Sequence, residues 1–406
     1  MPEDEINFSA KIKNIQYTPM MITESSLNEY SFEQFKRGEV GKSQFLLRIK
    51  NQLMAISRWV SPKRTRSYPY VRVYETLGHK NRLTIIPLVK DEGIGGDRDF
   101  LQWDTVSLMS LLGVYVIIAY YTSAEPNPRP EYQKTKITNQ DFDYGYLSSK
   151  IEEYLSYQSD ALHWNLKQLD ELDEVAQKCE ESYYERISPS LGIKMHDRVS
   201  FRRKIQEIIS SSDNFKQFSR EHAKGAQSRE VQTIQPKELL SNNPKVKLTI
   251  RNYLGGAYYF TADECLIFGD KVFLIEKKHT RGQMPSMNDI KDGAIKMILF
   301  TNIEEVKNSQ TFKPYPILGL TANDFSGIWT SWGIEEYNKE SLSQSDQQLL
   351  SIIKKESESN NFYTFLLGAD LLEQQNKILG TIIGEKFEMN YPNKNSKDQL
   401  TLDDFS

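Results

Sequence analysis

The chain has little cysteine, no long hydrophobic run and no strong excess of either charge. Its two cysteines, Cys179 and Cys265, are too few and too isolated for a disulfide framework or a zinc site, which fits a reducing compartment. No run approaches the roughly 18 to 20 apolar residues of a membrane-spanning helix, and the first residues lack the basic-then-apolar order of a secretory signal. A formal net charge of -4 argues against a protein that coats nucleic acid indiscriminately. We therefore expect a cytoplasmic protein with no membrane partner.

What the chain does contain is enough apolar sequence for two or three domains. Of its 406 residues, 38% are hydrophobic and 26% are charged. Helical and strand patterns are interleaved in the first part, which predicts an α/β block over residues 1–143. Within it we predict a helix over 44–60 and strands over 70–77, 82–89 and 114–121.

The next region, 144–222, has a helical pattern. Seven small or apolar residues recur at spacings of three, four and seven, which predicts one stripe of a long helix. They are Leu155, Leu162, Leu166, Leu169, Leu172, Ala176 and Cys179. A second helix is predicted over 200–210, and the polar segment 221–238 has the composition of a linker.

Strand patterns return in the C-terminal part, at 246–254, 257–268, 271–278 and 315–322. One helix is predicted before the last strand, because Ser286 followed by Asp289 resembles a capping box ahead of an apolar face. The prediction is thus a mixed α/β protein with a C-terminal core over 236–388, in which helices flank a central mixed sheet. A disordered tail over 389–406 is expected to follow.

The most informative stretch is DECLIFGDKVFLIEKKHTRG, which begins at Asp263. A turn at Gly269-Asp270 predicts a β-hairpin in which Asp263 faces Glu276, while Glu276 and Lys278 share one side of their strand. Two facing carboxylates repel each other, so a lysine, a divalent cation or both must stabilise them.

This pattern fits metal-assisted phosphodiester hydrolysis. Mg²⁺ prefers carboxylate oxygens, polarises a phosphoryl oxygen and lowers the pKa of a bound water. A nearby lysine can orient that water or stabilise negative charge in the transition state. The alternative is an ordinary ion pair between Glu276 and Lys278 at a sheet edge.

The pattern is Asp263 followed, after the apolar run KVFLI, by Glu276-Lys277-Lys278. It resembles the motif of the PD-(D/E)xK nucleases, which include most type II restriction endonucleases. The resemblance covers roughly residues 238–323. It implies a restriction-endonuclease-like core with Asp263 and Glu276 as metal ligands and catalytic residues, Lys278 as the catalytic lysine and Glu238 as an additional acid. Ala262 stands where the motif name has proline, and Glu264 could replace Asp263 as the first ligand.

A second acidic site is an open possibility in the glycine-rich segment VKDEGIGGDRDFLQWD. Carboxylates on such a loop could hold a cation, although turns, helix caps and arginine partners are the commoner use of such acids. Asp97 and Asp99 are the residues we would assign to a second metal or to a DNA-reading loop.

Two basic patches are candidates for DNA contact, because arginine can bind phosphate or read guanine edges. The residues are Lys63, Arg64, Arg66, Arg72, Arg202 and Arg203. Of the histidines, His279 is expected to border the site beside Lys278, and His196 to be structural and without a partner.

Together these features predict a Mg²⁺-dependent, sequence-specific double-stranded DNA endonuclease that leaves 5′-phosphate and 3′-hydroxyl ends. The α/β block over residues 1–143 is expected to contribute DNA recognition. A homodimer is expected, because cutting both strands is easiest for a two-fold pair, and a restriction enzyme implies a cognate DNA methyltransferase in the host. Two alternatives stay open: a structure-specific or RNA-directed nuclease of the same superfamily, and a non-catalytic DNA-binding protein.

Overall fold

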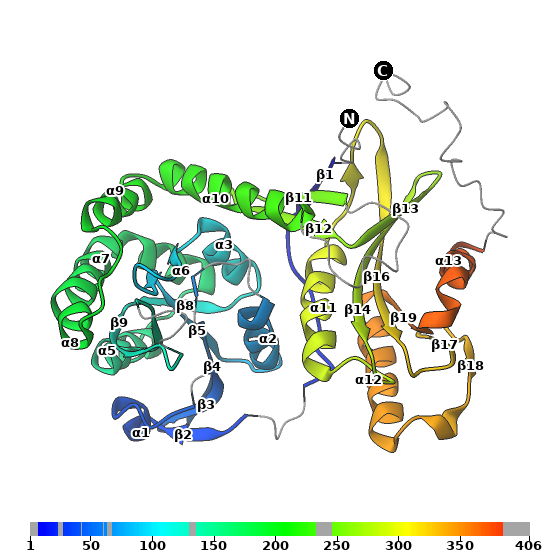
Figure 1. Ribbon diagram of the computed structural model, residues 1–406, viewed down its shortest axis with the longest axis horizontal. Coiled ribbons are helices and arrows are strands. Elements are labelled where there is room, and N and C mark those ends of the chain that lie inside the picture. Colours follow the sequence, from blue (N-terminus) through cyan, green and yellow to red (C-terminus); the bar gives the residue numbers. More distant parts are fainter. Residues whose placement is uncertain are drawn as a thin grey trace. The chain divides into compact units, whose positions relative to one another are not determined.

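The computed structural model describes residues 7–22, 27–41, 43–59, 61–62, 67–129, 135–232 and 246–384, and it is a mixed α/β protein (Figure 1). The chain forms two compact units. Unit 1 comprises Met1–Met21, Gln227–Asn252 and Tyr258–Ser406, and unit 2 comprises Ile22–Ala226 and Tyr253–Ala257. Unit 2 contains the expected first block apart from its first 21 residues, and it contains the whole of the expected helical region 144–222.

Unit 2 is built on a five-stranded sheet in the order β2-β3-β4-β5-β8. Its strands are β2 (Glu29–Ser31), β3 (Gln44–Ile49), β4 (Gln52–Arg58), β5 (Arg82–Pro87) and β8 (Tyr115–Ala119). Two further strand pairs are β6 (Val89–Asp91) with β7 (Arg98–Phe100), and β9 (Tyr121–Pro126) with β10 (Ile137–Phe142). The predicted strands at 82–89 and 114–121 are therefore confirmed.

The helices of unit 2 come mainly after β10. They are α1 (Phe32–Lys36), α2 (Ser67–Thr76), α3 (Trp103–Leu111), α5 (Tyr144–Leu155), α6 (Ala161–Asp170), α7 (Leu172–Glu181), a π-helical turn (Ser182–Ile187), α8 (Ser188–Leu191), α9 (Arg198–Ile209) and α10 (Ser212–Gln232). The predicted helix at 200–210 corresponds to α9.

Two predictions in the first block were wrong. Residues 44–58 form the antiparallel hairpin β3–β4 instead of a helix, with Ile49 paired to Gln52 across the turn. Nearly every apolar residue of this hairpin is buried, so the pattern has no polar face that would distinguish two strands from a helix. Conversely, the expected strand at 70–77 is mostly helix α2, which buries Val73 and Tyr74 and is followed directly by the buried Leu77.

The single long helix predicted from the leucine stripe is also wrong, because the chain breaks into α5, α6 and α7. Asp160 begins α6 by accepting a hydrogen bond from the His163 N–H, and Leu166 is 41% exposed. The expected linker begins instead as the second half of α10, which continues to Gln232. This segment contains several alanines, glutamates and glutamines, which favour a helix.

Unit 1 is built on a ten-stranded sheet. Eight strands follow the order β12-β11-β1-β15-β16-β19-β17-β18. In addition, β14 pairs with β16, and β13 pairs with β14. Their bounds are β1 (Asn7–Ile12), β11 (Val246–Asn252), β12 (Ala257–Ala262), β13 (Glu264–Phe268), β14 (Lys271–Thr280), β15 (Val306–Lys307), β16 (Thr311–Ala322), β17 (Gly327–Thr330), β18 (Glu335–Tyr337) and β19 (Tyr363–Gly368). β1 lies between β11 and β15, which no local pattern in the sequence predicted.

Helices cover both faces of the central strands of unit 1, as Figure 1 shows for α11 and α13. The helical segments are α11 (Met287–Phe300), α12 (Gln344–Asn360), α13 (Gln375–Ile383) and the 3-10 turns Lys339–Ser341 and Ala369–Gln374. β14, β16 and β19 are mutually parallel, and α11 is the crossover between the first two. Ile378 and Leu379 of α13 pack in one core cluster with Phe273, Ile275 and Phe365 on the opposite face from α11.

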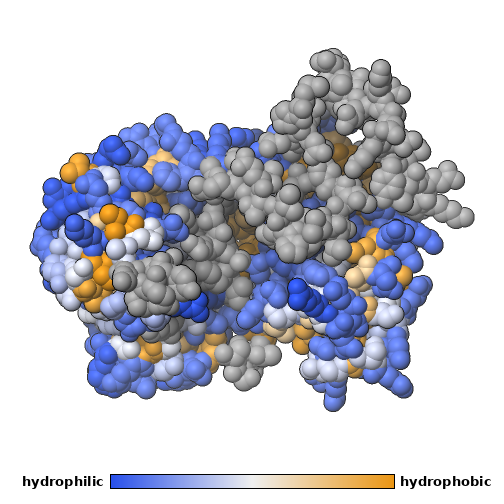
Figure 2. Space-filling model, viewed as in Figure 1, coloured by the Kyte–Doolittle hydropathy of each residue, from blue (hydrophilic) through white to orange (hydrophobic). Residues whose placement is uncertain are grey.

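The described surface is mainly polar. Figure 2 shows hydrophilic residues over most of the visible, described face, with small apolar patches between them. The large apolar side chains that are exposed come from separate elements: Met20, Ile94, Leu166, Val199, Tyr253 and Ile267. Within the described ranges, the helices are too short or too polar to cross a membrane. The predicted tail and Glu238 lie outside the described residues.

Candidate active site

The hairpin that carries the acidic motif has the predicted turn. β13 and β14 are antiparallel, with Phe268 paired to Lys271, so Gly269 and Asp270 form the turn. Gly269 has a φ of 56°, a left-handed conformation that glycine adopts readily. The register ends with Glu264 opposite Ile275, and one further step places Asp263 opposite Glu276. The buried Asp263 carboxylate accepts a hydrogen bond from the Lys277 N–H at 2.9 Å.

Glu276 is the centre of a network of alternating charges. Its side chain is 2% exposed, and the Lys278 Nζ lies 3.0 Å from its Oε1. The Lys296 Nζ lies 2.7 Å from its Oε2. Lys278 also contacts the Asp292 carboxylate at 2.6 Å, which completes a row of two acids and two lysines. Each charge in this row therefore has an opposite charge beside it.

Helix α11 supplies half of this network. Asp292 and Lys296 are four residues apart, so both lie on the helix face that packs on β14 and β16. The Ser286 side chain accepts the Asp289 N–H at the start of α11, as predicted. Sequence reasoning missed Asp292 and Lys296, because their spacing of four places them on one helix face but does not show that this face reaches Glu276.

Gly293 lets α11 approach the strand closely. A Cβ atom there would lie 2.5 Å from the Leu318 Cδ1 and 3.4 Å from the Lys278 Cε. The Lys278 side chain thus passes beside a helix position that has no side chain. This contact fixes the aliphatic stem of Lys278 while its ammonium group reaches the two carboxylates.

The surroundings of Lys278 keep its charge. Burial alone would lower the pKa of Lys278, but the carboxylates of Glu276 and Asp292 outweigh it, and the pKa is raised well above its usual range. Lys278 is therefore a positively charged donor at all physiological pH values. It is suited to stabilising negative charge and unsuited to accepting a proton.

The other acid of the hairpin lies on the opposite face of the sheet. The Glu264 Oε2 is 2.5 Å from the Lys277 Nζ and accepts a hydrogen bond from Gln375 of α13 at 2.9 Å. Both Glu264 and Lys277 are buried. Of the two candidate first ligands, Asp263 is the one that the strand register places on the same face of the sheet as Glu276.

A divalent cation could use the carboxylates of Asp263 and Glu276. Mg²⁺ is commonly bound by one or two carboxylates, with waters and substrate phosphates completing its shell, so this donor set fits. Within the described ranges no group of three or more His, Cys, Asp or Glu side chains could hold a metal ion. Because both Glu276 oxygens contact lysines, a cation would compete with Lys278 and Lys296 for them. The Nδ1 of His279 is 2.9 Å from the Thr321 Oγ1, and strand alternation places His279 on the same side of β14 as Lys277.

The acidic loop of unit 2 is held by several separate partners. Asp97 is exposed, whereas Asp99 is buried and accepts a hydrogen bond from the Ser61 Oγ at 3.0 Å. Asp91 is buried and lies 2.7 Å from the His196 Nδ1, so the expectation that His196 has no partner was wrong. Asp104 accepts hydrogen bonds from the Ser219 Oγ and from the Ala257 N–H. These contacts give the buried acids structural partners.

The candidate DNA-contact residues are only partly described. Lys63, Arg64 and Arg66 lie outside the described residues, and Arg72 donates a hydrogen bond to the backbone oxygen of Arg58 at 2.7 Å. Arg202 is 61% exposed but contacts Glu180, and Arg203 is exposed. The α9 patch is therefore partly neutralised by an acid of α7.

Comparison with known proteins finds no match among family models, curated proteins or solved structures. The class that the fold defines is a mixed α/β protein with a ten-stranded mixed sheet in unit 1.

Proposed function

We propose that this chain is a Mg²⁺-dependent endodeoxyribonuclease of the PD-(D/E)xK type, with a restriction-endonuclease-like core in unit 1. Its substrate is double-stranded DNA, which it cuts at a specific sequence to leave 5′-phosphate and 3′-hydroxyl ends. The proposal includes a cytoplasmic homodimer and a cognate DNA methyltransferase in the host. Unit 2 would contribute the DNA recognition.

The observation that carries the proposal is the position of three side chains at one end of the β13–β14 hairpin. Asp263 lies one step beyond the last pair of the register, and Glu276 and Lys278 share the face covered by α11. The strand order around them, an antiparallel hairpin followed by a crossover helix and a parallel strand, supports the same assignment.

The two lysines of the network then have distinct chemical roles. Lys278, which stays protonated, would donate to a non-bridging phosphate oxygen and stabilise the charge that develops there. Lys296 would hold Glu276 in place, because it contacts the second carboxylate oxygen and the backbone oxygen of Thr261 at 3.2 Å. A bound Mg²⁺ would supply Lewis-acid polarisation and a water of lowered pKa.

One observation favours a second candidate, a DNA-binding protein without catalysis. Both carboxylate oxygens of Glu276 contact lysines, which is also the arrangement of a structural ion-pair network. A structure-specific or RNA-directed nuclease would use the same residues on branched or single-stranded substrates. The choice among these functions depends on an activity measurement.

The test is a cleavage assay with unmethylated phage DNA and Mg²⁺, with EDTA added to a parallel sample. Wild type is compared with Lys278→Ala and with Lys277→Ala as a matched control, because Lys277 is a buried, ion-paired lysine on the opposite face of the same strand. We expect discrete fragments from wild type and Lys277→Ala, and intact DNA from Lys278→Ala and with EDTA.

Other results would redirect the assignment. Intact DNA in every lane, together with cleavage of branched or single-stranded substrates, would favour the structure-specific nuclease. Intact nucleic acid throughout, with Mg²⁺-independent binding, would favour the DNA-binding protein. Cleavage that persists in Lys278→Ala would refute the role of Lys278 and direct attention to Asp97 and Asp99.

A further inference from the structure

Lys296 places a positive charge on oxygens that a metal ion could use. Its Nζ lies 2.7 Å from the Glu276 Oε2 and donates a hydrogen bond to the backbone oxygen of Thr261 at 3.2 Å. Carboxylate and backbone carbonyl oxygens are both ligands that divalent cations take from proteins. Thr261 lies near the end of β12, two residues before Asp263, so this backbone oxygen and the other proposed metal ligand come from one short segment. The Lys296 ammonium group therefore stands where a small cation would find its ligands.

Lys296 also covers one oxygen of Glu276. The Glu276 side chain is 2% exposed, whereas the Lys296 side chain is 19% exposed. Because lysine carries its charge on a flexible four-carbon stem, Lys296 can turn its ammonium group into water while its stem stays on the protein. Glu276 is thus closed to a cation while Lys296 is in place, and it becomes accessible when Lys296 moves.

Lys278, the other lysine on Glu276, has an anchor that does not depend on this carboxylate. Its Nζ contacts Glu276 at 3.0 Å and Asp292 at 2.6 Å. Its stem passes beside Gly293, where a Cβ would lie 3.4 Å from the Lys278 Cε. Both of these contacts can remain when a cation binds to Glu276. Lys278 would therefore keep its position for the phosphate group while Lys296 moves away.

We propose that Lys296 is an internal counter-ion that a divalent cation displaces from Glu276 and Thr261. This inference rests on the proposed function for the identity of the metal ligands, Asp263 and Glu276. The Glu276 carboxylate has a positive group beside it before and after the exchange, because one cation replaces another. Lys296 also sets the metal affinity, since it competes for the same oxygens. Cation binding is then weaker than the two carboxylates alone would give.

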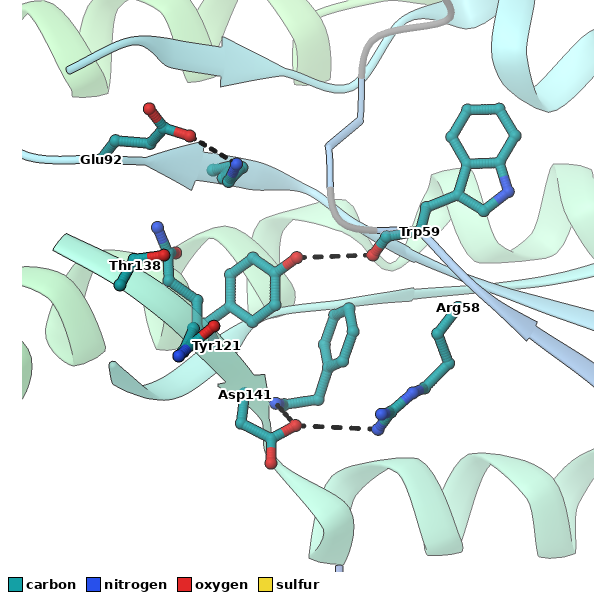
Figure 3. A pocket seen from close by; sticks show the side chains of 10 residues that line it. Arg58, Trp59, Glu92, Tyr121, Thr138 and Asp141 are labelled. Carbon is teal, nitrogen blue, oxygen red and sulfur yellow. Dashed lines mark hydrogen bonds and ion pairs between the residues drawn. The ribbon is translucent and has the colours of Figure 1, made fainter. Parts of the chain in front are cut away.

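A glutamate in unit 2 provides a matched control. Lys90 and Lys136 contact the two oxygens of Glu92, at 2.5 Å and 2.7 Å, and the Lys90 side chain is 18% exposed. Glu92 borders a cavity in which another carboxylate, that of Asp141, points towards Arg58 (Figure 3). Lys90→Met therefore removes a lysine of matching exposure from a glutamate outside the proposed metal site.

The test measures Mn²⁺ binding to the full-length protein without DNA, by electron paramagnetic resonance of the free ion. Mn²⁺ takes the same oxygen ligands as Mg²⁺. Because a competing unit charge is removed, we expect Lys296→Met to bind Mn²⁺ roughly tenfold more tightly than wild type. Lys90→Met should bind it as wild type does, and Glu276→Gln should lose the site. Lys296→Gln also removes the charge, and it replaces Lys296→Met if that variant does not fold.

A second measurement follows the displaced side chain itself. Acetylation by an N-hydroxysuccinimide ester, read by mass spectrometry, reports how accessible each lysine amine is. Saturating Mn²⁺ should increase the acetylation of Lys296 severalfold and leave that of Lys278 unchanged, because only Lys296 turns into solvent. In Glu276→Gln, Mn²⁺ should change the acetylation of neither lysine.

These outcomes are separate from the cleavage assay. Equal Mn²⁺ affinity in wild type and Lys296→Met, or no Glu276-dependent site in either protein, overturns the displacement whether or not DNA is cut. Unchanged acetylation of Lys296 in saturating Mn²⁺ also overturns it. Tighter binding in Lys90→Met as well would overturn it, because the effect would then be one of net charge. Tighter binding in Lys296→Met alone, without cleavage of any nucleic acid, would keep the displacement and refute the nuclease assignment.

Discussion

Replacing Lys278 by methionine tests whether the Glu276 network is a buried, coupled unit. The four charges of Glu276, Lys278, Asp292 and Lys296 cancel, and Lys278→Met leaves a net charge of one carboxylate in a largely buried place. Removing one partner of a buried ion pair costs about 3 to 5 kcal/mol. Because Lys296 still contacts Glu276 and Asp292 is 25% exposed, we expect a loss near the lower limit of about 3 kcal/mol.

The assay is hydrogen exchange by mass spectrometry on peptides that cover β14. A loss of about 3 kcal/mol corresponds to roughly a hundredfold faster exchange of the protected amides. The matched variant is Glu276→Gln combined with Lys278→Met, which leaves the charges of Asp292 and Lys296 balanced. If the network is coupled, the double variant loses less protection than the sum of the single variants. Additive losses, or a change below about threefold in Lys278→Met, would refute the reasoning.

Three further changes test local features. Gly327→Ala should destabilise unit 1 by about 1 to 3 kcal/mol in chemical denaturation, because φ is 131° and a Cβ would lie 2.4 Å from the Glu336 backbone oxygen; an unchanged midpoint would contradict this geometry. The pKa of Glu92 is held at about 2, since hydrogen bonds to two lysines outweigh the opposing effect of burial. Because the folded-state pKa of Glu92 is depressed, the stabilisation from its charge is present above about pH 4.5 and is lost as the pH falls towards 2. In thermal melts, the melting temperature of unit 2 should therefore depend less on pH over this range in Glu92→Gln than in wild type. Ser286→Ala should cost about 1 kcal/mol through loss of the N-cap of α11, whereas Ser286→Asp should keep most of that stability in the same melts.

The hairpin and its helix could be predicted because their signals are local. A glycine-aspartate turn, an alternating face and a serine cap lie within about 25 residues of one another and define β13, β14 and the start of α11. The contribution of Asp292 and Lys296 could not be fixed in the same way, since it depends on the rotation of α11 against the sheet. Apolar periodicity indicates which face of a helix is buried, but it does not specify which polar residue at the border of that face reaches the strand.

Other elements could not be predicted because tertiary packing overrides local preference. Valine and tyrosine favour strands, yet Val73 and Tyr74 are buried within helix α2. Nearly every apolar residue of the hairpin at 44–58 is buried, so its apolar spacing also matched a helix. The site residues Asp263, Glu276 and Lys278 were placed by strand alternation, which is the most regular of these patterns.

The position of β1 has a consequence for how the protein folds during synthesis. Asn7 pairs with Lys247, so 240 residues separate the first strand from its parallel neighbour. At about 5 to 20 residues per second, a ribosome needs roughly 12 to 48 s to make the intervening chain. Unit 2 is nearly continuous in sequence and has time to fold in that interval. During the same time β1 lacks its parallel neighbour, and its unpaired edge can be bound by chaperones or other chains. Unit 1 is therefore completed only when segments from both sides of unit 2 in the sequence come together.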